Sequence, residues 1–253
     1  MEKSKKKSWL YRAIKATVGA FYPKMDIVGA DKLPDGPLVI VGNHSQLHGP
    51  IACELYFPDD HYIWCASQMM EIREVPAYAY GDFWSEKPRW QRPFYKLLSY
   101  LIAPLSALIF KNARTVAVYK DRRVLATFKE SAARLASGQS IIIFPEHDEK
   151  HNNIINGFQD GFVDLAKLYY KRTGKELSFV PLYIAPRLHK MYLGTPVTFC
   201  AENPLDEEKK RICAYLADEI SSIAYSLPEH VVVPYKNISK KLYPKSTREA
   251  KED

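Results

Sequence analysis

Residues 39–50 read VIVGNHSQLHGP, and this stretch decides the predicted fold. The apolar run Leu38–Val41 predicts a buried strand, and the proline that ends the stretch suits the start of a helix over Pro50–Phe57. Two histidines, His44 and His48, therefore lie on the turn between a strand and a helix. The free N–H groups of such a turn favour anions and bias a histidine toward its neutral form, which a general base needs. A polar turn with incidental histidines is the plainer interpretation of this stretch taken alone.

Buried strands and amphipathic helices alternate along the chain on both sides of this stretch. Apolar runs predict strands at Met25–Val28, His61–Ala66, Thr115–Tyr119, Ile141–Phe144, Leu177–Ile184 and Pro196–Cys200. Helical spacing of apolar residues predicts helices over Val124–Ala136, Gln159–Lys171 and Asp206–Tyr225, the second of them closed at Gly174. The alternation predicts an α/β fold with a largely parallel mixed sheet flanked by helices.

Two apolar segments do not follow this alternation. Met69–Arg92 is irregular and aromatic, which predicts either a lid or acyl-binding loop or a packed surface excursion. Phe94–Phe110 is strongly apolar but contains Pro104, and its 14 residues after Lys96 are too few to span a bilayer. We expect a buried helix kinked at Pro104, with a second membrane-interface element as the alternative.

The positive charge of the chain is concentrated at its N-terminus. Residues 1–24 carry seven basic side chains against Glu2 alone, a net charge of +6, whereas the other 229 residues carry +1. Apolar residues between Trp9 and Phe21 recur there at helical spacing. We expect a basic amphipathic helix that binds anionic lipid at a membrane surface, with a helix packed on the core as the alternative. The uneven charge argues against a nucleic-acid partner.

The remaining composition predicts one large α/β domain over residues 25–235 and a polar, charged tail over 236–253, which we expect to be frayed. The four cysteines are far apart and form no CxxC, so we expect reduced thiols. No uninterrupted apolar segment reaches the roughly 18–20 residues of a spanning helix, and no signal segment follows the basic start. We therefore expect a peripheral protein at the cytoplasmic face of a membrane.

Three polar clusters follow predicted strands, where ligands bind in open α/β sheets. The first cluster contains Asn43, His44 and His48. The second contains Lys120, Asp121, Arg122 and Arg123. The third contains Glu146, His147 and Asp148, with His151 nearby in sequence. We expect these clusters to converge on one site.

The order of the clusters resembles the glycerolphosphate and lysophosphatidic acid acyltransferases. That family carries four ordered blocks: Asn-His with Asp after four further residues, a strand that ends near a phosphate-binding Arg, Phe-Pro-Glu-Gly, and an apolar strand with Pro. The corresponding residues here are Asn43-His44, Val116–Lys120 with Arg122 and Arg123, Phe144-Pro145-Glu146, and Val180-Pro181-Leu182. The resemblance covers residues 38–186 and implies an O-acyltransferase of the 1-acyl-sn-glycerol-3-phosphate acyltransferase type.

The family's chemistry implies a role for each cluster. Its histidine is the general base for an acceptor hydroxyl that attacks an acyl thioester of coenzyme A or acyl carrier protein, with no further cofactor. The resemblance implies that His44 is this base and that Glu146 helps to order the acceptor, a lysophospholipid or related glycerolipid. Lys120, Arg122 or Arg123 would hold an acceptor phosphate. Further substrate-binding residues implied by the blocks are Asn43, Phe144, Pro145 and His147.

Two positions depart from the family's pattern. The family's aspartate corresponds to Gly49, and the last glycine of Phe-Pro-Glu-Gly corresponds to His147. The carboxylate that would orient His44 must then come from Glu146 or Asp148, with His48 also close in sequence. Otherwise the acceptor chemistry has shifted, or the chain is a catalytically weak relative that binds lipids or acyl chains.

Two HxxxH pairs, His44/His48 and His147/His151, suggest a third interpretation. An i, i+4 pair on a helix can chelate a metal, with Glu146 or Asp148 adding oxygen ligands, as in a metal-dependent hydrolase. His44 is expected to precede the helix, however, and no HExxH motif is present. We therefore predict no metal site.

Overall fold

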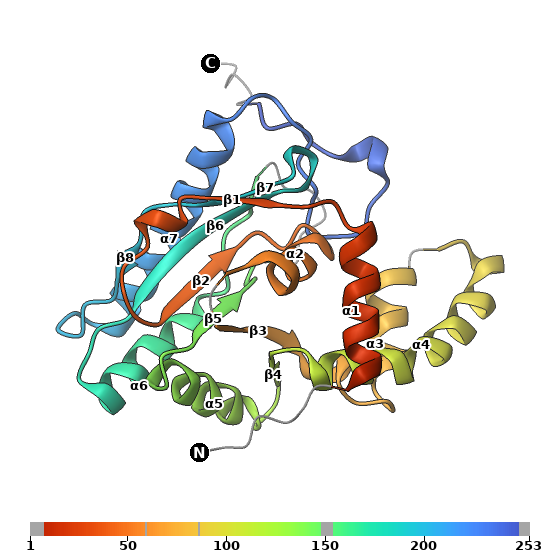
Figure 1. The fold of residues 1–253 in the computed structure, drawn as a ribbon, viewed down its shortest axis with the longest axis horizontal. Helices are drawn as coiled ribbons and strands as arrows, with labels where there is room; N and C mark the ends of the chain where they lie inside the picture. Colours follow the sequence, from red (N-terminus) through yellow and green to blue (C-terminus); the bar gives the residue numbers. More distant parts are fainter. Residues whose placement is uncertain (1–7, 59, 86, 148–153, 248–253) are drawn as a thin grey trace. The chain divides into compact units, whose positions relative to one another are not determined.

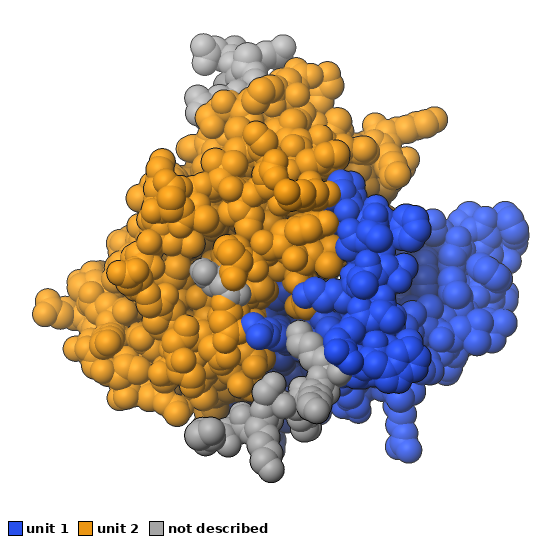
Figure 2. Space-filling model, in the orientation of Figure 1, with its two compact units in different colours: residues 1–23, 63–127 blue, residues 24–62, 128–253 orange. Residues whose placement is uncertain are grey.

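The computed structural model describes residues 8–58, 60–85, 87–147 and 154–247. Two predicted site residues, Asp148 and His151, lie outside the described residues, as do the lysines before Ser8. The chain folds into two compact units, coloured separately in Figure 2. The first unit contains residues 1–23 and 63–127, and the second contains residues 24–62 and 128–253. The domain boundaries expected at residues 24 and 235 stay predictions.

The second unit is built on a mainly parallel sheet (Figure 1). Strand β2 (Leu38–Gly42) lies between β5 (Ser140–Ile143) and β6 (Ser178–Ala185) and is parallel to both. These three strands are almost wholly buried, which explains why their sequences are continuous apolar runs rather than alternating ones. The predicted α/β fold class, with a largely parallel sheet flanked by helices, is thus confirmed.

Shorter strands extend the sheet beyond β6. Strand β7 (Lys190–Leu193) is antiparallel to β6, β1 (Asp26–Val28) is parallel to β7, and β8 (Val197–Thr198) pairs with the start of β6. The sequence predicted β1 and β8 but missed β7. That strand begins two residues after the turn Pro186–Leu188 and is only four residues long.

Three helices pack within the second unit. Helix α2 (His48–Tyr56) begins two residues before the predicted start. Helix α6 (Asp164–Thr173) begins later than expected, because residues 160–163 form a 3-10 turn, and it ends as predicted at Gly174 with a left-handed φ of 71°. Helix α7 (Leu205–Ser226) packs on β6. Its buried apolar face contains Ile212, Leu216, Ile220 and Ala224.

The first unit is mainly helical. It contains α1 (Trp9–Phe21), α3 (Val75–Ala79), α4 (Arg92–Asn112) and β4 (Thr115–Val118), which pairs in parallel with β3 (His61–Ala66) from residue 63 onward. Helix α5 (Val124–Ala136) has the predicted bounds and carries the chain from this unit to the other. In α1, Tyr11 is buried, whereas Trp9 and Phe21 are exposed.

Two expectations for this unit are wrong. The segment between Met69 and Arg92 is not irregular but largely helical: it contains α3, a π-helical turn and a 3-10 turn. Helix α4 continues through Pro104, and five of its large apolar or aromatic residues are exposed rather than buried: Phe94, Leu97, Tyr100, Leu101 and Leu105. By length and composition, one helical stretch of the described chain, 89–112, qualifies as a membrane span, with mean hydropathy 1.4.

Candidate active site

The candidate site lies in the second unit, where three neighbouring parallel strands end. Strand β2 leads into Asn43 and His44, and β5 leads into the turn that holds Glu146. Since Val41 lies opposite both Ile143 and Pro181, the three strands end at one edge of the sheet. The first and third sequence clusters are therefore brought together.

Asn43 fixes the start of the turn. Its buried side chain pairs with the main chain of Ile184 on β6, accepting from the N–H at 2.6 Å and donating to the carbonyl oxygen at 3.0 Å. The same amide nitrogen donates to Ser45 Oγ at 2.8 Å. These contacts tie the end of β2 to the neighbouring strand, so Asn43 positions the residue that follows it.

The turn after His44 has an unusual backbone. Ser45 and Gln46 both have left-handed conformations, with φ of 47° and 55°. Such residues cost about 1–3 kcal/mol each and persist only where the surroundings fix them, often at functional sites. Here Ser45 O accepts from His48 N at 3.0 Å, and His44 O accepts from Gly49 N at 3.1 Å. The sequence carries no signal for this conformation, because neither residue is glycine.

The His44 side chain is held between aromatic rings. Its ring meets those of Phe144 and Tyr235 edge-on, with centroids 5.5 and 5.0 Å away. Its Nδ1 atom is buried and has no hydrogen-bond partner among the described residues. Burial lowers the pKa of His44 from 6.5 to about 4. The imidazole is therefore neutral at pH 7, but it is a weak base.

Glu146 binds the His44 main chain rather than its ring. Its buried carboxylate accepts a hydrogen bond from the His44 N–H. Burial raises the pKa of Glu146 from 4.5 to about 7, against the opposing effect of that hydrogen bond. The suggestion that Glu146 orients the His44 ring is thus wrong for this structure. Glu146 instead fixes where the histidine lies.

The surroundings of Gly49 leave no room for the aspartate that the sequence resemblance would place at this position. A Cβ at this position would lie 2.6 Å from His44 O, 3.0 Å from Phe144 Cε1 and 3.2 Å from Asn43 O. Two of these atoms are main-chain oxygens, so the turn would have to move to admit any side chain. The compact turn and an aspartate at position 49 are mutually exclusive.

Two basic side chains near His48, Arg187 and Lys240, belong to none of the three sequence clusters. His48 is the first residue of α2 and is half-buried. Burial lowers its pKa first, and the positive charges of Arg187 and Lys240 add to the effect. Arg187 lies two residues after the end of β6, so its position near a strand's carboxyl end was the available signal.

The C-terminal segment, residues 228–246, contacts the His44 turn. Besides the Tyr235 ring, Lys236 O and Tyr243 Oη accept hydrogen bonds from Gln46 Nε2 at 3.1 and 2.7 Å. The segment is anchored at His230, whose Nε2 lies 2.7 Å from Tyr183 Oη. As far as it is described, the chain after Tyr235 is therefore packed at the site rather than a frayed tail.

The second sequence cluster belongs to the first unit, where Lys120, Arg122 and Arg123 are all exposed. The Arg123 guanidinium forms a two-point ion pair with Asp121 at 2.8–3.0 Å, and it also lies over the Tyr119 ring. This contact raises the pKa of Arg123 and lowers that of Asp121. The arginine fork is thus already occupied by a carboxylate.

The residues on either side of Glu146 form a paired loop. Pro145 O accepts from Gln159 N at 2.8 Å, and His147 N donates to Gly157 O at 3.2 Å, so the loop is held by its main chain. In the described part of the chain, no group of three or more His, Cys, Asp or Glu side chains is arranged to hold a metal ion. His44 precedes α2 whereas His48 begins it, so the first HxxxH pair does not share a helix face.

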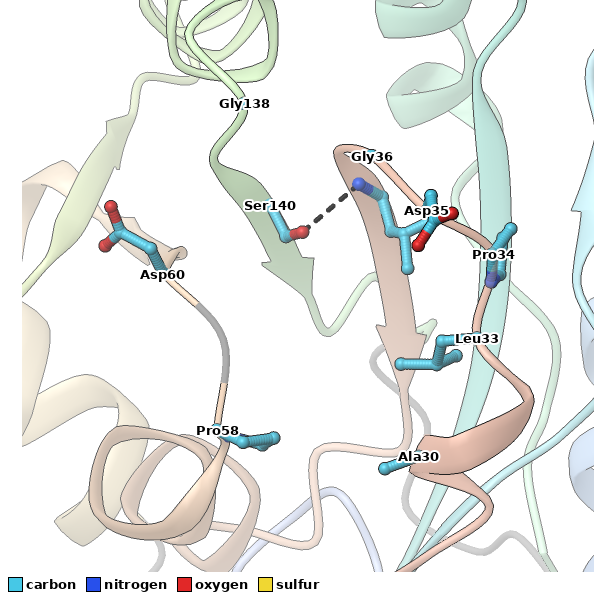
Figure 3. Close-up of a pocket in the computed structure, with 10 residues that line it drawn as sticks. Ala30, Leu33, Pro34, Asp35, Gly36, Pro58, Asp60, Gly138 and Ser140 are labelled. Carbon is cyan, nitrogen blue, oxygen red and sulfur yellow. Dashed lines mark hydrogen bonds between the residues drawn. The ribbon is translucent and has the colours of Figure 1, made fainter.

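A pocket of about 390 Å³ lies at the opposite end of the same strands (Figure 3). Leu38 and Ser140, the first residues of β2 and β5, line it and are joined by a 3.1 Å hydrogen bond. Asp35 and Asp60 also line it. Since ligands of such sheets bind at the carboxyl ends, we do not assign the chemistry to this pocket.

Comparison of the sequence with models of known protein families and with curated proteins gives no match. Among solved structures, the chain is similar to the crystal structure of the 1-acyl-sn-glycerophosphate (LPA) acyltransferase PlsC from Thermotoga maritima. The identity is 14%, the TM-score is 0.47, and the match covers 83% of this chain and 78% of the other. A similarity this distant carries no argument about activity, so the function is argued from the residues.

Proposed function

We propose that this chain is an acyltransferase that moves a fatty acyl group from a thioester donor to a hydroxyl of a lysophospholipid or related glycerolipid. The observation that carries the proposal is the arrangement of His44 and Glu146. A neutral histidine stands at the carboxyl end of a central parallel strand, and a buried carboxylate from the next strand fixes its main chain. The motif order Asn-His, then Phe-Pro-Glu, supports the same reaction.

The chemistry follows from the neutral imidazole. The acceptor hydroxyl oxygen attacks the thioester carbonyl carbon while His44 takes the hydroxyl proton. The tetrahedral intermediate then collapses, the carbon–sulfur bond breaks, and the proton leaves with the sulfur as a free thiol. Since Nδ1 is buried among protein atoms, we assign the proton transfer to Nε2. The reaction needs no cofactor beyond the thioester of coenzyme A or acyl carrier protein.

We assign binding of the acceptor phosphate to lysine and arginine side chains. An acceptor phosphate would interact with basic side chains, for which the sequence favours Lys120, Arg122 and Arg123, while Arg187 and Lys240 lie near His48. We propose that the chain works at the cytoplasmic face of a membrane, where residues 1–24 attract anionic lipid. The charge of +6 in that segment supports this location.

One set of observations favours a second candidate, a catalytically weak relative that binds lipids or acyl chains. No carboxylate of the described chain contacts the His44 ring, and its pKa of about 4 makes it a poor proton acceptor. In serine proteases, loss of the orienting carboxylate lowers kcat by about 10⁴. This candidate predicts lipid binding without turnover.

A donor–acceptor panel separates the two candidates. Purified protein is incubated with acyl-coenzyme A or acyl carrier protein thioesters and with lysophosphatidic acid, other lysophospholipids or glycerol 3-phosphate, and both free thiol and the new ester are measured. Acceptor-dependent thiol release with matching ester supports the acyltransferase. Thiol release without an ester, or no turnover together with vesicle binding, would contradict it.

A further inference from the structure

Helix α4 buries small or polar residues and exposes several large apolar ones, which is the reverse of the usual pattern in a water-soluble protein. Its buried residues are small or polar: Ser99, Ala103, Ser106 and Ala107. Its exposed residues include Phe94, Leu97, Tyr100, Leu101 and Leu105. An amphipathic helix of a water-soluble protein buries its large apolar residues and exposes polar ones. In α4 the exposed large residues recur three or four positions apart, so they form one continuous apolar face.

The buried face of α4 is satisfied within the first unit. Ser106 Oγ donates to Met69 O at 2.9 Å, and Ser99 Oγ donates to the helix's own Lys96 O at 2.7 Å. Ala103 packs with Val75 and Ala79 of α3 in a small buried cluster. Small residues that allow close helix approach, together with serine hydrogen bonds, are typical of helix contacts in lipid. Ile102 packs, partly buried, against the same cluster, so α4 has an inner face that is separate from its exposed apolar face.

The exposed face is large for an unpartnered surface. Leu97 is 61% exposed, Leu101 is 68% exposed and Phe94 is 64% exposed. Contiguous apolar surface of this kind marks an interaction site on a soluble protein. The exposed large residues run from Phe94 to Leu105, which at 1.5 Å per residue is about 17 Å of helix. The face is therefore an apolar strip about three helical turns long.

Charge indicates which partner fits the strip. Residues 89–112 contain Arg89, Arg92, Lys96 and Lys111 but no acidic residue. Three of these cations lie near the start of α4 and are exposed, while Lys111 pairs with Glu71 at 3.5 Å. Cations beside an apolar helix face suit a lipid surface, where acyl chains meet anionic headgroups. Trp90, next to these cations, is 80% exposed, and tryptophan is enriched at that depth of the bilayer.

We propose that the exposed face of α4 docks on a lipid bilayer and lies along its interface, with its apolar residues among the acyl chains. Helix α1 belongs to the same unit and adds exposed Trp9 and Phe21, and the Ser8 N–H donates to Asn112 Oδ1 at the end of α4. The lipid contact is thus a property of the first unit and extends beyond the basic N-terminal segment. It does not depend on the chemistry of His44.

The test compares two equally exposed leucines. Leu101→Glu changes the centre of the α4 face, whereas Leu125→Glu makes the same change on α5, where Leu125 is 65% exposed. Full-length protein is floated with neutral phosphatidylcholine vesicles in high salt, which screens the attraction of the lysine-rich N-terminus. Since burial of a leucine side chain is worth about 1.5–3 kcal/mol, we expect Leu101→Glu to weaken vesicle binding about tenfold or more. Leu125→Glu should bind like the wild type.

Folding and self-association are checked on the same samples by circular dichroism and sedimentation. Equal vesicle binding by wild type and Leu101→Glu would overturn the proposal, as would equal losses in both variants. A wild-type dimer that Leu101→Glu converts to a monomer, with vesicle binding unchanged, would assign the face to a second copy of the chain instead. Acyl transfer in detergent is a separate readout, so failure of the proposed reaction leaves this result interpretable.

Discussion

At the level of single residues, the compact His44 turn depends on the absence of a side chain at Gly49. A side chain there would meet the His44 and Asn43 carbonyl oxygens, so glycine allows the turn to close on itself. The closed turn leaves Nδ1 of His44 buried beside aromatic rings instead of beside a carboxylate. Glu146 holds the main chain of His44, which replaces part of the positioning that an orienting carboxylate would give.

Gly49→Asp should therefore fail to restore the family's pairing of histidine and aspartate. The new Cβ lies within 3.0 Å of a main-chain oxygen, and overpacking of this kind costs about 1–3 kcal/mol before the carboxylate is buried. We expect a lower free energy of unfolding in urea and no gain in acyl transfer. Gly49→Ala is the matched control, because it adds the same Cβ without the charge and should account for most of the steric cost. A Gly49→Asp protein as stable as the wild type, with faster transfer, would contradict this explanation of the turn.

At the level of elements, the C-terminal segment packs against the His44 turn. Tyr235 covers the imidazole, and hydrogen bonds from Gln46 to Lys236 and Tyr243 hold the segment on the turn. This contact could not be predicted from the sequence, since the segment is polar and lies nearly 200 residues from His44. Long-range packing of a polar segment leaves no periodic pattern to recognise.

Tyr235→Ala should raise the pKa of His44 from about 4 toward its ordinary 6.5. Burial against the Tyr235 ring disfavours the charged imidazolium and so lowers the pKa of His44. Removing the ring admits water, which stabilises the charged form and raises the pKa. A change of roughly one unit is expected. Histidine NMR titration measures it, with the His44 signals assigned by their loss in His44→Ala. Tyr235→Phe keeps the ring and should keep the low pKa, while an unchanged pKa in Tyr235→Ala would show that the ring does not cause the shift.

The sequence predicted elements well where burial leaves a pattern. The bounds of α5 and the stop of α6 at Gly174 came directly from helical spacing and glycine chemistry. Strand β6 was predicted although it contains Pro181. In the structure, β7 pairs with residues 182–185 of β6 and β8 pairs with residues 178–179. Pro181 lies between these two paired segments, where a proline is tolerated. The prediction that α4 is a buried helix was wrong, because an apolar composition does not by itself require burial and several of its large apolar residues are exposed.

At the level of the whole molecule, some features follow from sequence patterns and others depend on tertiary contacts. The sheet of the second unit and the adjacency of His44 and Glu146 follow from parallel strands with apolar sequences. The left-handed conformations of Ser45 and Gln46 and the position of Lys240 near His48 depend on tertiary contacts, so no local sequence pattern predicts them. The first unit gathers the apolar surfaces of α1 and α4. Chemistry is thus assigned to one unit and lipid docking to the other.

The most direct measurement is the rate of acyl transfer by His44→Ala beside the wild type, under the donor and acceptor conditions that the panel identifies. A general base contributes about 10²–10⁴-fold, so the variant should lose at least about a hundredfold in rate while its thermal unfolding stays close to that of the wild type. His189→Asn is the control: it removes an exposed histidine outside the site, and asparagine tolerates its left-handed φ of 53°. An unchanged rate in His44→Ala would contradict the assignment of His44 as the base.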